Sequence, residues 1–522
     1  MHKDSVTFLA KDNKDFADRQ LSLAAVQEQV QKIRKGQSYR QLSGPCTLQD
    51  GILQIPESEI VRYMTVHNEA QAQGRFMKFV PASGAATRMF KVFFEAQNHL
   101  RSKVKGAAPT LHDLVLSEDP EWKGLRTCLL SLPNFAFYEP LLKVLAEWGY
   151  RARNPQDLIE IPDLLDAILS PAGLDFANAP KGLIPFHREQ AEIRTAFQEH
   201  MLEAIDYLKP QTGPICMHFT LAEEHREKVL AHLQAFAQTC QAEFQIESSL
   251  QSPQSDTIAL DLQGFPMRDG QGQILFRPGG HGSLLENLQA CGGDLVFIKN
   301  IDNTVPARNR AHQIRYKKLL GGLLLETEEK LSKIGQSLRS GAAADQLIRQ
   351  IQATIGVKPP ESLLQSSAQQ QAEWVADRLN RPLRVCGMVR NQGEPGGGPF
   401  WVQQADGTQT LQIVEKAEIK LSDPIQLEHL SRSTHFNPVD ILCSLRDAEG
   451  KQRPLQRFAD PDTYFISQKS HQGHPLHALE WPGLWNGSMA HWNTVFVEVP
   501  LATFNPVKEV QDLLRPEHQG AL

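Results

Sequence analysis

The sequence predicts an α/β protein with a Rossmann-like, three-layer, mostly parallel sheet. From residue 180 onward, short apolar stretches of strand character alternate with helical stretches, as in parallel sheets covered by helices on both faces. Residues 75–91 read as the same kind of unit: an apolar strand, a turn of small residues and a helix. With 41% hydrophobic and 22% charged residues, the 522-residue chain is typical of a globular protein with a large core.

The chain divides into a helical N-terminal extension, residues 1–70, and one large α/β domain, residues 71–522. Two stretches of that domain, about 95–179 and 307–380, carry helical patterns with few strand signals, so we interpret them as helical insertions. Residues 383–522 return to strand patterns and form the C-terminal part of the domain.

Hydrophobic periodicity and turn-forming residues predict the individual helices and strands. The expected strands are 75–80, 214–219, 243–247, 256–261, 294–298, 383–389, 411–414 and 494–499, and the main expected helices are 21–33, 57–66, 87–100, 222–238 and 283–290. The helix after the first strand is expected to carry Thr87 and Arg88 in its first turn.

Charge and cysteine content narrow the class of protein. A net charge of -6 gives no reason to expect a nucleic-acid partner or an acidic membrane surface. The seven cysteines are scattered and never spaced as CxxC, which argues against a zinc site or a disulfide framework. The N-terminus lacks the apolar core of a signal peptide, and no apolar run approaches membrane-spanning length. We therefore expect a cytoplasmic protein, and the oligomeric state stays open.

The loop between the first strand and its helix is a candidate anion site. Small side chains let backbone N–H groups approach a phosphate, and a helix N-terminus favours negative charge. The loop consists of Ala82, Ser83, Gly84, Ala85, Ala86 and Thr87, followed by Arg88. A tight turn without a ligand is the alternative explanation.

Five later segments place charged or polar residues beside glycines, prolines or strand ends. They are Pro180-Lys181-Gly182-Leu183-Ile184-Pro185-Phe186, Arg277-Pro278-Gly279-Gly280-His281-Gly282-Ser283, Phe297-Ile298-Lys299-Asn300-Ile301-Asp302-Asn303, Ile413-Val414-Glu415-Lys416-Ala417-Glu418-Ile419, and Phe504-Asn505-Pro506-Val507-Lys508. Together with the loop, their order resembles the signatures of the UDP-sugar pyrophosphorylases, which join a nucleoside triphosphate to a sugar 1-phosphate. That resemblance implies a nucleotidyltransferase or GT-A type of sheet. Segments 81–89, 393–400 and 484–487 also resemble a bacterial family of domains of unknown function.

The resemblance also implies roles for individual residues. Residues 82–87, Gln251, Gly280, His281 and Gly282 would bind the nucleotide, and Glu415 and Asn437 would bind sugar hydroxyls. Asp302, at a strand end, would hold Mg²⁺ together with phosphate oxygens and water. A second acid is open between Asp440 and Glu498.

The reaction explains why basic residues are needed. A sugar-phosphate oxygen attacks the α-phosphorus and pyrophosphate leaves, so the protein mainly positions reactants and neutralises charge. Arg88, Lys181 and Lys508 are the expected catalytic cations. The leading hypothesis is a Mg²⁺-dependent uridylyltransferase acting on UTP and a sugar 1-phosphate. The alternatives are a non-catalytic nucleotide-sugar-binding protein, because Ser83 and Ala86 replace two glycines of the signature, and a glycosyltransferase on the same type of fold.

Overall fold

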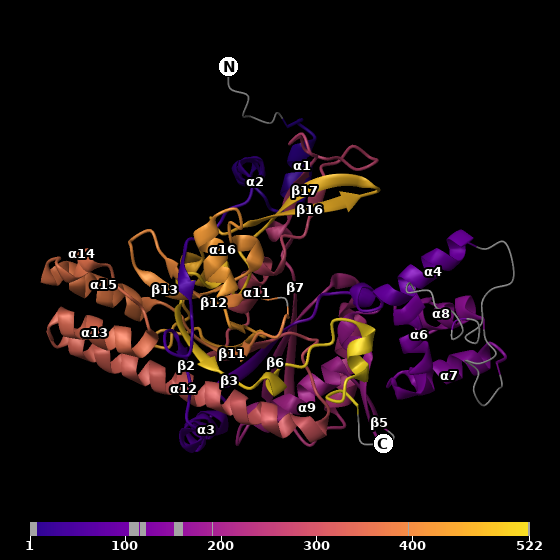
Figure 1. Ribbon diagram of the computed structural model, residues 1–522, viewed down its shortest axis with the longest axis horizontal. Coiled ribbons are helices and arrows are strands. Elements are labelled where there is room, and N and C mark those ends of the chain that lie inside the picture. Colours follow the sequence, from indigo (N-terminus) through magenta and orange to yellow (C-terminus); the bar gives the residue numbers. More distant parts are fainter. Residues whose placement is uncertain are drawn as a thin grey trace.

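The computed structural model describes residues 8–103, 114, 122–150, 160–190, 192–394 and 396–519 (Figure 1). Its centre is a nine-stranded sheet. In spatial order the strands are β2 (Ile52–Leu53), β18 (Asn493–Glu498), β11 (Leu383–Arg390), β15 (Asp440–Ser444), β10 (Leu295–Lys299), β3 (Phe76–Pro81), β6 (Ile215–Leu221) and β7 (Phe244–Leu250), with β14 (His435–Phe436) paired to β11. The α/β class predicted from the sequence is confirmed.

The sheet is mixed, with long parallel runs. Strands β10, β3, β6 and β7 pair in parallel, and so do β11, β18 and β2. Strand β15 joins the two runs and is antiparallel to both of its neighbours. The carboxyl ends of the parallel strands therefore lie at one edge, together with the start of β15. The three-layer Rossmann-like arrangement stays a prediction.

Apolar residues alternate between two buried faces of this sheet. Phe76 and Val80 of β3 belong to a core with residues of α3 (Glu57–Ala72), α9 (Ala196–Leu208) and α12 (Ala307–Arg339). Met77 and Phe79 belong to a second core with residues of α11 (Leu284–Ala290). The central strands are thus enclosed on both sides, and the strand ends are left for chemistry.

Helix α12 crosses α3 closely because two glycines lie at the crossing. A Cβ on Gly321 would lie 2.0 Å from Nδ1 of His67, and one on Gly322 would lie 2.0 Å from the carbonyl oxygen of Tyr63. His67 stacks on Phe76 with ring centroids 4.4 Å apart, so the crossing also fixes α3 against the sheet.

Helices occupy the described parts of both expected insertions (Figure 1). The first contains α4 (Lys91–Lys103), α6 (Lys123–Leu130), α7 (Tyr138–Glu147) and α8 (Ile161–Leu169), and the second contains α12, α13 (Ala344–Ile355), α14 (Glu361–Leu364) and α15 (Ala368–Asn380). The remaining α-helices are α1 (Asp12–Asp18), α2 (Leu23–Lys35), α10 (Arg226–Ala237) and α16 (Pro424–Ser431). None of the helices in the described ranges is long and apolar enough to cross a membrane.

Three smaller sheets surround the main one. They are β1 (Leu42–Pro45) with β12 (Gly398–Gln403) and β13 (Gln409–Val414); β16 (Phe465–His471) with β17 (His474–Glu480), β8 (Thr257–Leu260) and β9 (Phe276–Arg277); and β4 (Pro185–Glu189) with β5 (Glu192–Thr195). Residues 1–70 thus contain strands as well as helices, since β1 pairs with β12 and β2 with β18. Strand β8 falls where a strand was expected, but it pairs antiparallel with β17 and β9 outside the main sheet.

Candidate functional site

Two lysines predicted to act on phosphates and the predicted metal ligand meet at the carboxyl edge of the main sheet. Oδ2 of Asp302 accepts a hydrogen bond from Nζ of Lys181 at 2.8 Å and from Nζ of Lys508 at 2.9 Å. Asp302 follows β10, Lys181 lies in the 3-10 helix η5 (Lys181–Leu183), and Lys508 precedes the 3-10 helix η13 (Val510–Leu514). In open α/β sheets this edge is where ligands bind. We call Lys181, Asp302 and Lys508 the phosphate cluster.

Backbone hydrogen bonds hold the cluster together. The amide of Lys181 donates to the carbonyl of Gly84 at 3.2 Å, which joins η5 to the small-residue loop. The amide of Val507 donates to the carbonyl of Asp302 at 3.0 Å. The amide of Asn505 donates to Oδ1 of Asn303 at 3.0 Å. Segments far apart in the sequence are therefore fixed at one place.

The cluster joins two lysines to one aspartate, and the carboxylate of Asp512 also acts on Lys181. Burial alone would raise the pKa of Asp302, but the ammonium groups of Lys181 and Lys508 outweigh burial and hold that pKa below its ordinary value. Burial lowers the pKa of Lys181, and Asp302 opposes the shift. The side chain of Lys181 is 14% exposed and that of Lys508 is 48% exposed, so an incoming anion has access to Lys508 first.

Three buried polar atoms beside the cluster have no hydrogen-bond partner among the described residues. They are Oδ1 of Asp302, Nδ2 of Asn303 and Oγ1 of Thr304. Unpaired buried polar atoms are rare in folded proteins and call for an explanation such as a ligand or an ion. The turn after β10 is therefore built to receive polar groups.

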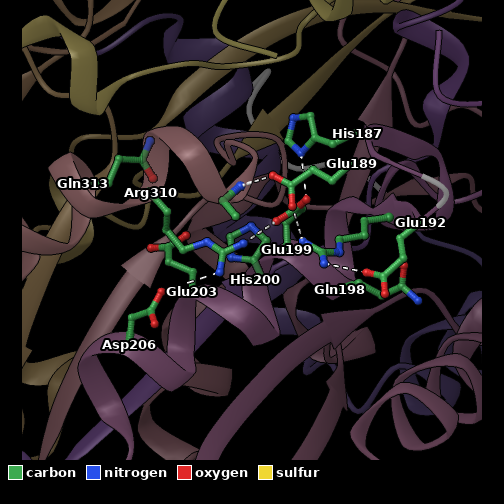
Figure 2. Close-up of polar contacts among 12 residues, drawn as sticks. His187, Glu189, Glu192, Gln198, Glu199, His200, Glu203, Asp206, Arg310 and Gln313 are labelled. Carbon is green, nitrogen blue, oxygen red and sulfur yellow. Dashed lines mark hydrogen bonds and ion pairs between the residues drawn. The ribbon is translucent and has the colours of Figure 1, made fainter. Parts of the chain in front are cut away.

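A buried network lies between this turn and helices α9 and α12. Nζ of Lys299 donates to Oε2 of Glu203 at 2.8 Å and to Oε1 of Gln313 at 3.0 Å. Nε2 of His200 donates to the carbonyl of Ile301 at 3.2 Å, and Nζ of Lys78 lies 3.5 Å from Glu203. Figure 2 shows His200 and Glu203 on α9, with Gln313 nearby. The network fixes the residues on both sides of Asn300, and so the position of Asp302.

The small-residue loop adjoins the phosphate cluster but does not start a long helix. Ala86–Arg88 form a three-residue 3-10 helix, and α4 begins only at Lys91. The expectation that Thr87 and Arg88 lie in the first turn of that α-helix is wrong. Met89 and Phe90, which are buried in the core, separate Arg88 from the start of α4. Ser83, Gly84, Ala85 and Thr87 are exposed, whereas Ala82 and Ala86 are buried.

Arg88 lies in the loop without a partner of its own. Its side chain is exposed and contacts no acidic group among the residues that the structure describes. Because the amide of Val510 donates to the carbonyl of Met89 at 2.9 Å, Arg88 is next to a segment that adjoins Lys508. The role of Arg88 at the phosphates stays a prediction.

A second group of predicted residues meets around His281. Its ring stacks on Trp485, with centroids 4.3 Å apart, and Nδ1 accepts a hydrogen bond from the amide of Leu484 at 2.9 Å. The proton is therefore on Nε2, which lies 3.9 Å from Oε1 of Glu415. Burial lowers the pKa of His281, so the ring is neutral near pH 7. Predicted nucleotide-side and sugar-side residues are thus neighbours.

Glycines allow the segment that carries His281 to pass close to the backbone of Pro482. A Cβ on Gly282 would lie 2.1 Å from the carbonyl oxygen of Pro482, a distance that no side chain permits. Gly280 has a φ of 77°, which is unfavourable for residues with a Cβ. Packing thus accounts for the glycines on either side of His281.

Two residues that the sequence-based assignment left out complete this group. The buried carboxyl of Glu418 accepts, at Oε2, hydrogen bonds from the amide of Glu415 at 2.8 Å and from Nδ2 of Asn486 at 3.1 Å. Burial raises the pKa of Glu418 to about 7. Within the described ranges, Oε1 of Glu418 and Oδ1 of Asn486 accept no hydrogen bond. The acid at the third position after Glu415 was a signal for this pairing. We call His281, Glu415, Glu418, Trp485 and Asn486 the aromatic–acid group.

Two other predicted residues are occupied by structural contacts. Nδ2 of Asn437 donates to the carbonyl of Gly387 at 2.9 Å, and its Oδ1 accepts from the amide of Val439 at 3.1 Å. Gln251 follows β7 and donates from Nε2 to Oγ of Ser255 at 3.3 Å. Asn437 therefore supports a turn, and a role at the sugar stays a prediction.

The donors at Asp302 suit a cation that arrives with phosphate ligands. Within the described ranges, no three His, Cys, Asp or Glu side chains are grouped so as to hold a metal ion. Asp302 nevertheless offers the unpaired Oδ1, and Mg²⁺ is often held by one carboxylate, phosphate oxygens and water. Of the two candidates for a second acid, Asp440 pairs with buried Lys317, and Glu498 pairs with Arg390 and His435. Asp302 is therefore the residue that fits the ion.

Comparison with solved structures shows the type of fold. The uridine diphosphate N-acetylglucosamine pyrophosphorylase of Trypanosoma brucei aligns with a TM-score of 0.50 and 11% identity, over 97% of this chain and 79% of that chain. The UDP-glucose pyrophosphorylase of Leishmania major aligns with a TM-score of 0.43 and 11% identity, over 98% and 79% of the two chains. No curated protein matches the sequence.

The family match covers nearly the whole sequence. Residues 9–519 match the domain of unknown function DUF4301, which agrees with the resemblance noted in the sequence. The chain therefore belongs to the DUF4301 family, whose member here has a fold similar to that of a UDP-sugar pyrophosphorylase.

Proposed function

We propose that the protein is a Mg²⁺-dependent sugar-1-phosphate nucleotidyltransferase that uses UTP. The observation that carries the proposal is the convergence of Lys181 and Lys508 on Asp302, whose second carboxylate oxygen is buried and unpaired. A pair of lysines at the carboxyl edge of a parallel run suits a triphosphate. The similarity of fold to the T. brucei enzyme supports the same reaction class.

The cluster has a different task before and after the nucleotide binds. Without phosphates, Oδ2 of Asp302 pairs with Nζ of Lys181 at 2.8 Å and with Nζ of Lys508 at 2.9 Å. Its negative charge offsets the repulsion between the two ammonium groups. When the triphosphate arrives, its oxygens compete with Asp302 for Lys181 and Lys508. Asp302 would hold Mg²⁺ together with phosphate oxygens and water. Mg²⁺ supplies neutralisation of the phosphate charge.

The same cations then favour the reaction. The sugar-phosphate oxygen attacks the α-phosphorus, and the bond to pyrophosphate breaks in line with that attack. Lys181, Lys508 and Arg88 stabilise the charge that moves onto the leaving pyrophosphate. The aromatic–acid group would bind the sugar, with Trp485 as an apolar surface and Glu415 as an acceptor for sugar hydroxyls.

Pyrophosphate release tests the proposal directly. Purified protein is incubated with Mg²⁺, each of the common nucleoside triphosphates and a panel of sugar 1-phosphates. We expect turnover with UTP and one sugar 1-phosphate, and a decrease of about 100- to 1000-fold for Lys181→Met, Lys508→Met or Asp302→Asn. Lys91→Met, an exposed lysine near the loop, is the matched control and leaves the rate unchanged. Absence of pyrophosphate with every substrate pair would refute catalysis.

A non-catalytic nucleotide-sugar binder is the second candidate. It is favoured by Ser83 and Ala86, which stand where the signature of the pyrophosphorylases has glycines, and by Ser283, where that signature has an acid. Isothermal titration with UDP-sugars separates the two. Binding that needs no Mg²⁺, survives Asp302→Asn and occurs without turnover supports the binder.

A further inference from the structure

A cavity of about 540 Å³ lies at the edge of the main sheet opposite to the phosphate cluster. Arg75 precedes β3, Asp294 precedes β10, Leu383 begins β11 and Ser444 ends β15, and all four line the cavity. Its volume is within the range of pockets that bind small organic molecules. No residue assigned to the proposed reaction lines this cavity.

Charged side chains form much of the polar lining. Five of them face the cavity, against four carboxylates: Arg75, Arg339, Arg381, Arg446 and Arg453, with Asp294, Glu328, Asp447 and Glu449. Arg75 pairs with Asp294 at 2.8 Å and lies 3.7 Å from Glu328. Arg381 pairs with Asp377 at 2.7 Å. Two of the five guanidinium groups are therefore compensated by nearby acids.

The other three have no carboxylate within ion-pair distance in the part of the chain that the structure describes. Arg446 donates to the carbonyls of Gly292 and Gly450 at 2.6 and 2.8 Å. Arg453 donates to the carbonyl of Asn380 at 3.0 Å and to that of Arg446. Arg339 makes no hydrogen bond to any described residue, and its side chain is exposed. Carbonyl oxygens orient these groups but do not neutralise them.

The nearby acids act on Arg453 from beyond ion-pair distance, because burial lowers its pKa while Asp447, Glu328 and Glu449 oppose that shift. Burial raises the pKa of Glu328, and its Oε1 already accepts a hydrogen bond from Oγ of Ser444. Oδ1 of Asp447 accepts the amides of Glu449 and Lys451 at 3.1 and 2.7 Å, which closes a turn. Arg339 lies in the last turn of α12, where the helix dipole favours a cation, but that reason does not apply to Arg446 and Arg453.

We propose that this cavity binds a small phosphate ester. Arg339, Arg446 and Arg453 would bind the phosphate, since guanidinium groups match phosphate oxygens with paired hydrogen bonds. Leu331, Leu379 and Leu383 also line the cavity and would pack against the organic part of the ester. The ligand would be about the size of a sugar phosphate or a nucleoside monophosphate.

Isothermal titration of the full-length protein tests the site with inorganic phosphate, glucose 6-phosphate and adenosine 5′-monophosphate as separate probes. We expect saturable binding of at least one ester, at least tenfold tighter than inorganic phosphate. Arg339→Gln removes one guanidinium that has no structural hydrogen bond, so the variant should keep the thermal unfolding midpoint and bind at least tenfold more weakly. Arg446→Lys keeps the charge but loses the paired geometry, and should also weaken binding.

Two control variants assign the binding to this cavity. Arg457→Gln removes an exposed arginine outside the cavity, and Lys181→Met alters the phosphate cluster; both should leave the affinity of the ester within twofold of wild type. The proposal is overturned if no ester saturates at millimolar concentration, or if inorganic phosphate binds as tightly as the ester. It is also overturned if Arg339→Gln and Arg446→Lys leave binding intact, or if Lys181→Met abolishes it.

Discussion

The ammonium group of Lys299 lies 2.8 Å from the carboxylate of Glu203, and both side chains are buried beneath the turn that carries Asp302. Lys78 shares the same carboxylate at 3.5 Å. One acid thus compensates two lysines in the core. This pairing helps to fix the position of Asp302, because Lys299 and Ile301 lie at the start of the turn that carries it.

Removing the charge of Glu203 should destabilise the protein strongly. In Glu203→Gln, two buried ammonium groups lose their counter-charge, so we expect a loss of about 3–5 kcal/mol in the free energy of unfolding, measured by urea denaturation. Glu192→Gln is the matched control, because the side chain of Glu192 is 71% exposed and its ion pair with Arg194 should contribute at most about 1 kcal/mol. Equal stability of Glu203→Gln and wild type would contradict the assigned pairing.

The crossing of α3 and α12 should tolerate no side chain at Gly322. Its Cβ would lie 2.0 Å from the carbonyl oxygen of Tyr63, so Gly322→Ala must separate the two helices. We expect a loss of about 1–3 kcal/mol by chemical denaturation, as for other overpacked positions. In the same helix, a Cβ on Gly335 would have its nearest neighbour at 3.6 Å. Gly335→Ala should therefore be neutral or stabilise by up to about 1 kcal/mol.

His67 should make stability depend on acid pH. Burial lowers its pKa to about 4 in the folded protein, from an ordinary value of 6.5. The unfolded chain therefore takes up this proton first, and stability should fall as the pH drops from 6.5 to 4. The contribution of His67 is about 3 kcal/mol over that range. His67→Gln should show a correspondingly shallower slope of unfolding free energy against pH, whereas exposed His474→Gln should keep the wild-type slope.

Glu418 should make the stability depend on pH in the opposite direction from His67. Its folded pKa of about 7 lies above the ordinary 4.5, so the folded protein holds a proton that the unfolded chain releases. The folded state therefore loses stability as the pH rises from 4.5 to 7, by about 3 kcal/mol in total. Glu418→Gln stays uncharged, and its stability relative to wild type should increase between pH 5 and pH 8. Exposed Glu428→Gln should show no such increase. A constant difference for Glu418→Gln would mean that Glu418 is ionised throughout.

Several strands of the main sheet could be predicted from local sequence patterns. Apolar runs located β3, β6, β10 and β11, because strands buried on both faces have near-continuous hydrophobic sequences. Lys181, Asp302 and Lys508 were predicted together, since each follows a segment that fixes its place at a strand end or turn. Their contact at 2.8 and 2.9 Å agrees with that prediction.

Pairings between distant segments could not be read in this way. Nothing local to Asp440–Ser444 shows that β15 runs against its neighbours, and nothing in Thr257–Leu260 places β8 beside β17 rather than in the main sheet. The contact of Glu203 with Lys299 and that of Glu418 with Asn486 likewise join residues on different elements. Such contacts are decided by packing of the whole fold, so the sequence pattern shows the residues but not their partners.

The order of the strands in the main sheet has a consequence for synthesis. Strands β3 and β10 lie near its centre, yet β15, β11 and β18, which continue the sheet from β10, come from the later part of the chain. During translation, the loop at 82–88, Lys181 and Asp302 leave the ribosome long before Lys508, and contacts of such high sequence separation form slowly. A partly made chain would hold Asp302 with one lysine instead of two. The phosphate cluster can therefore reach its full charge only after almost the whole chain has been made.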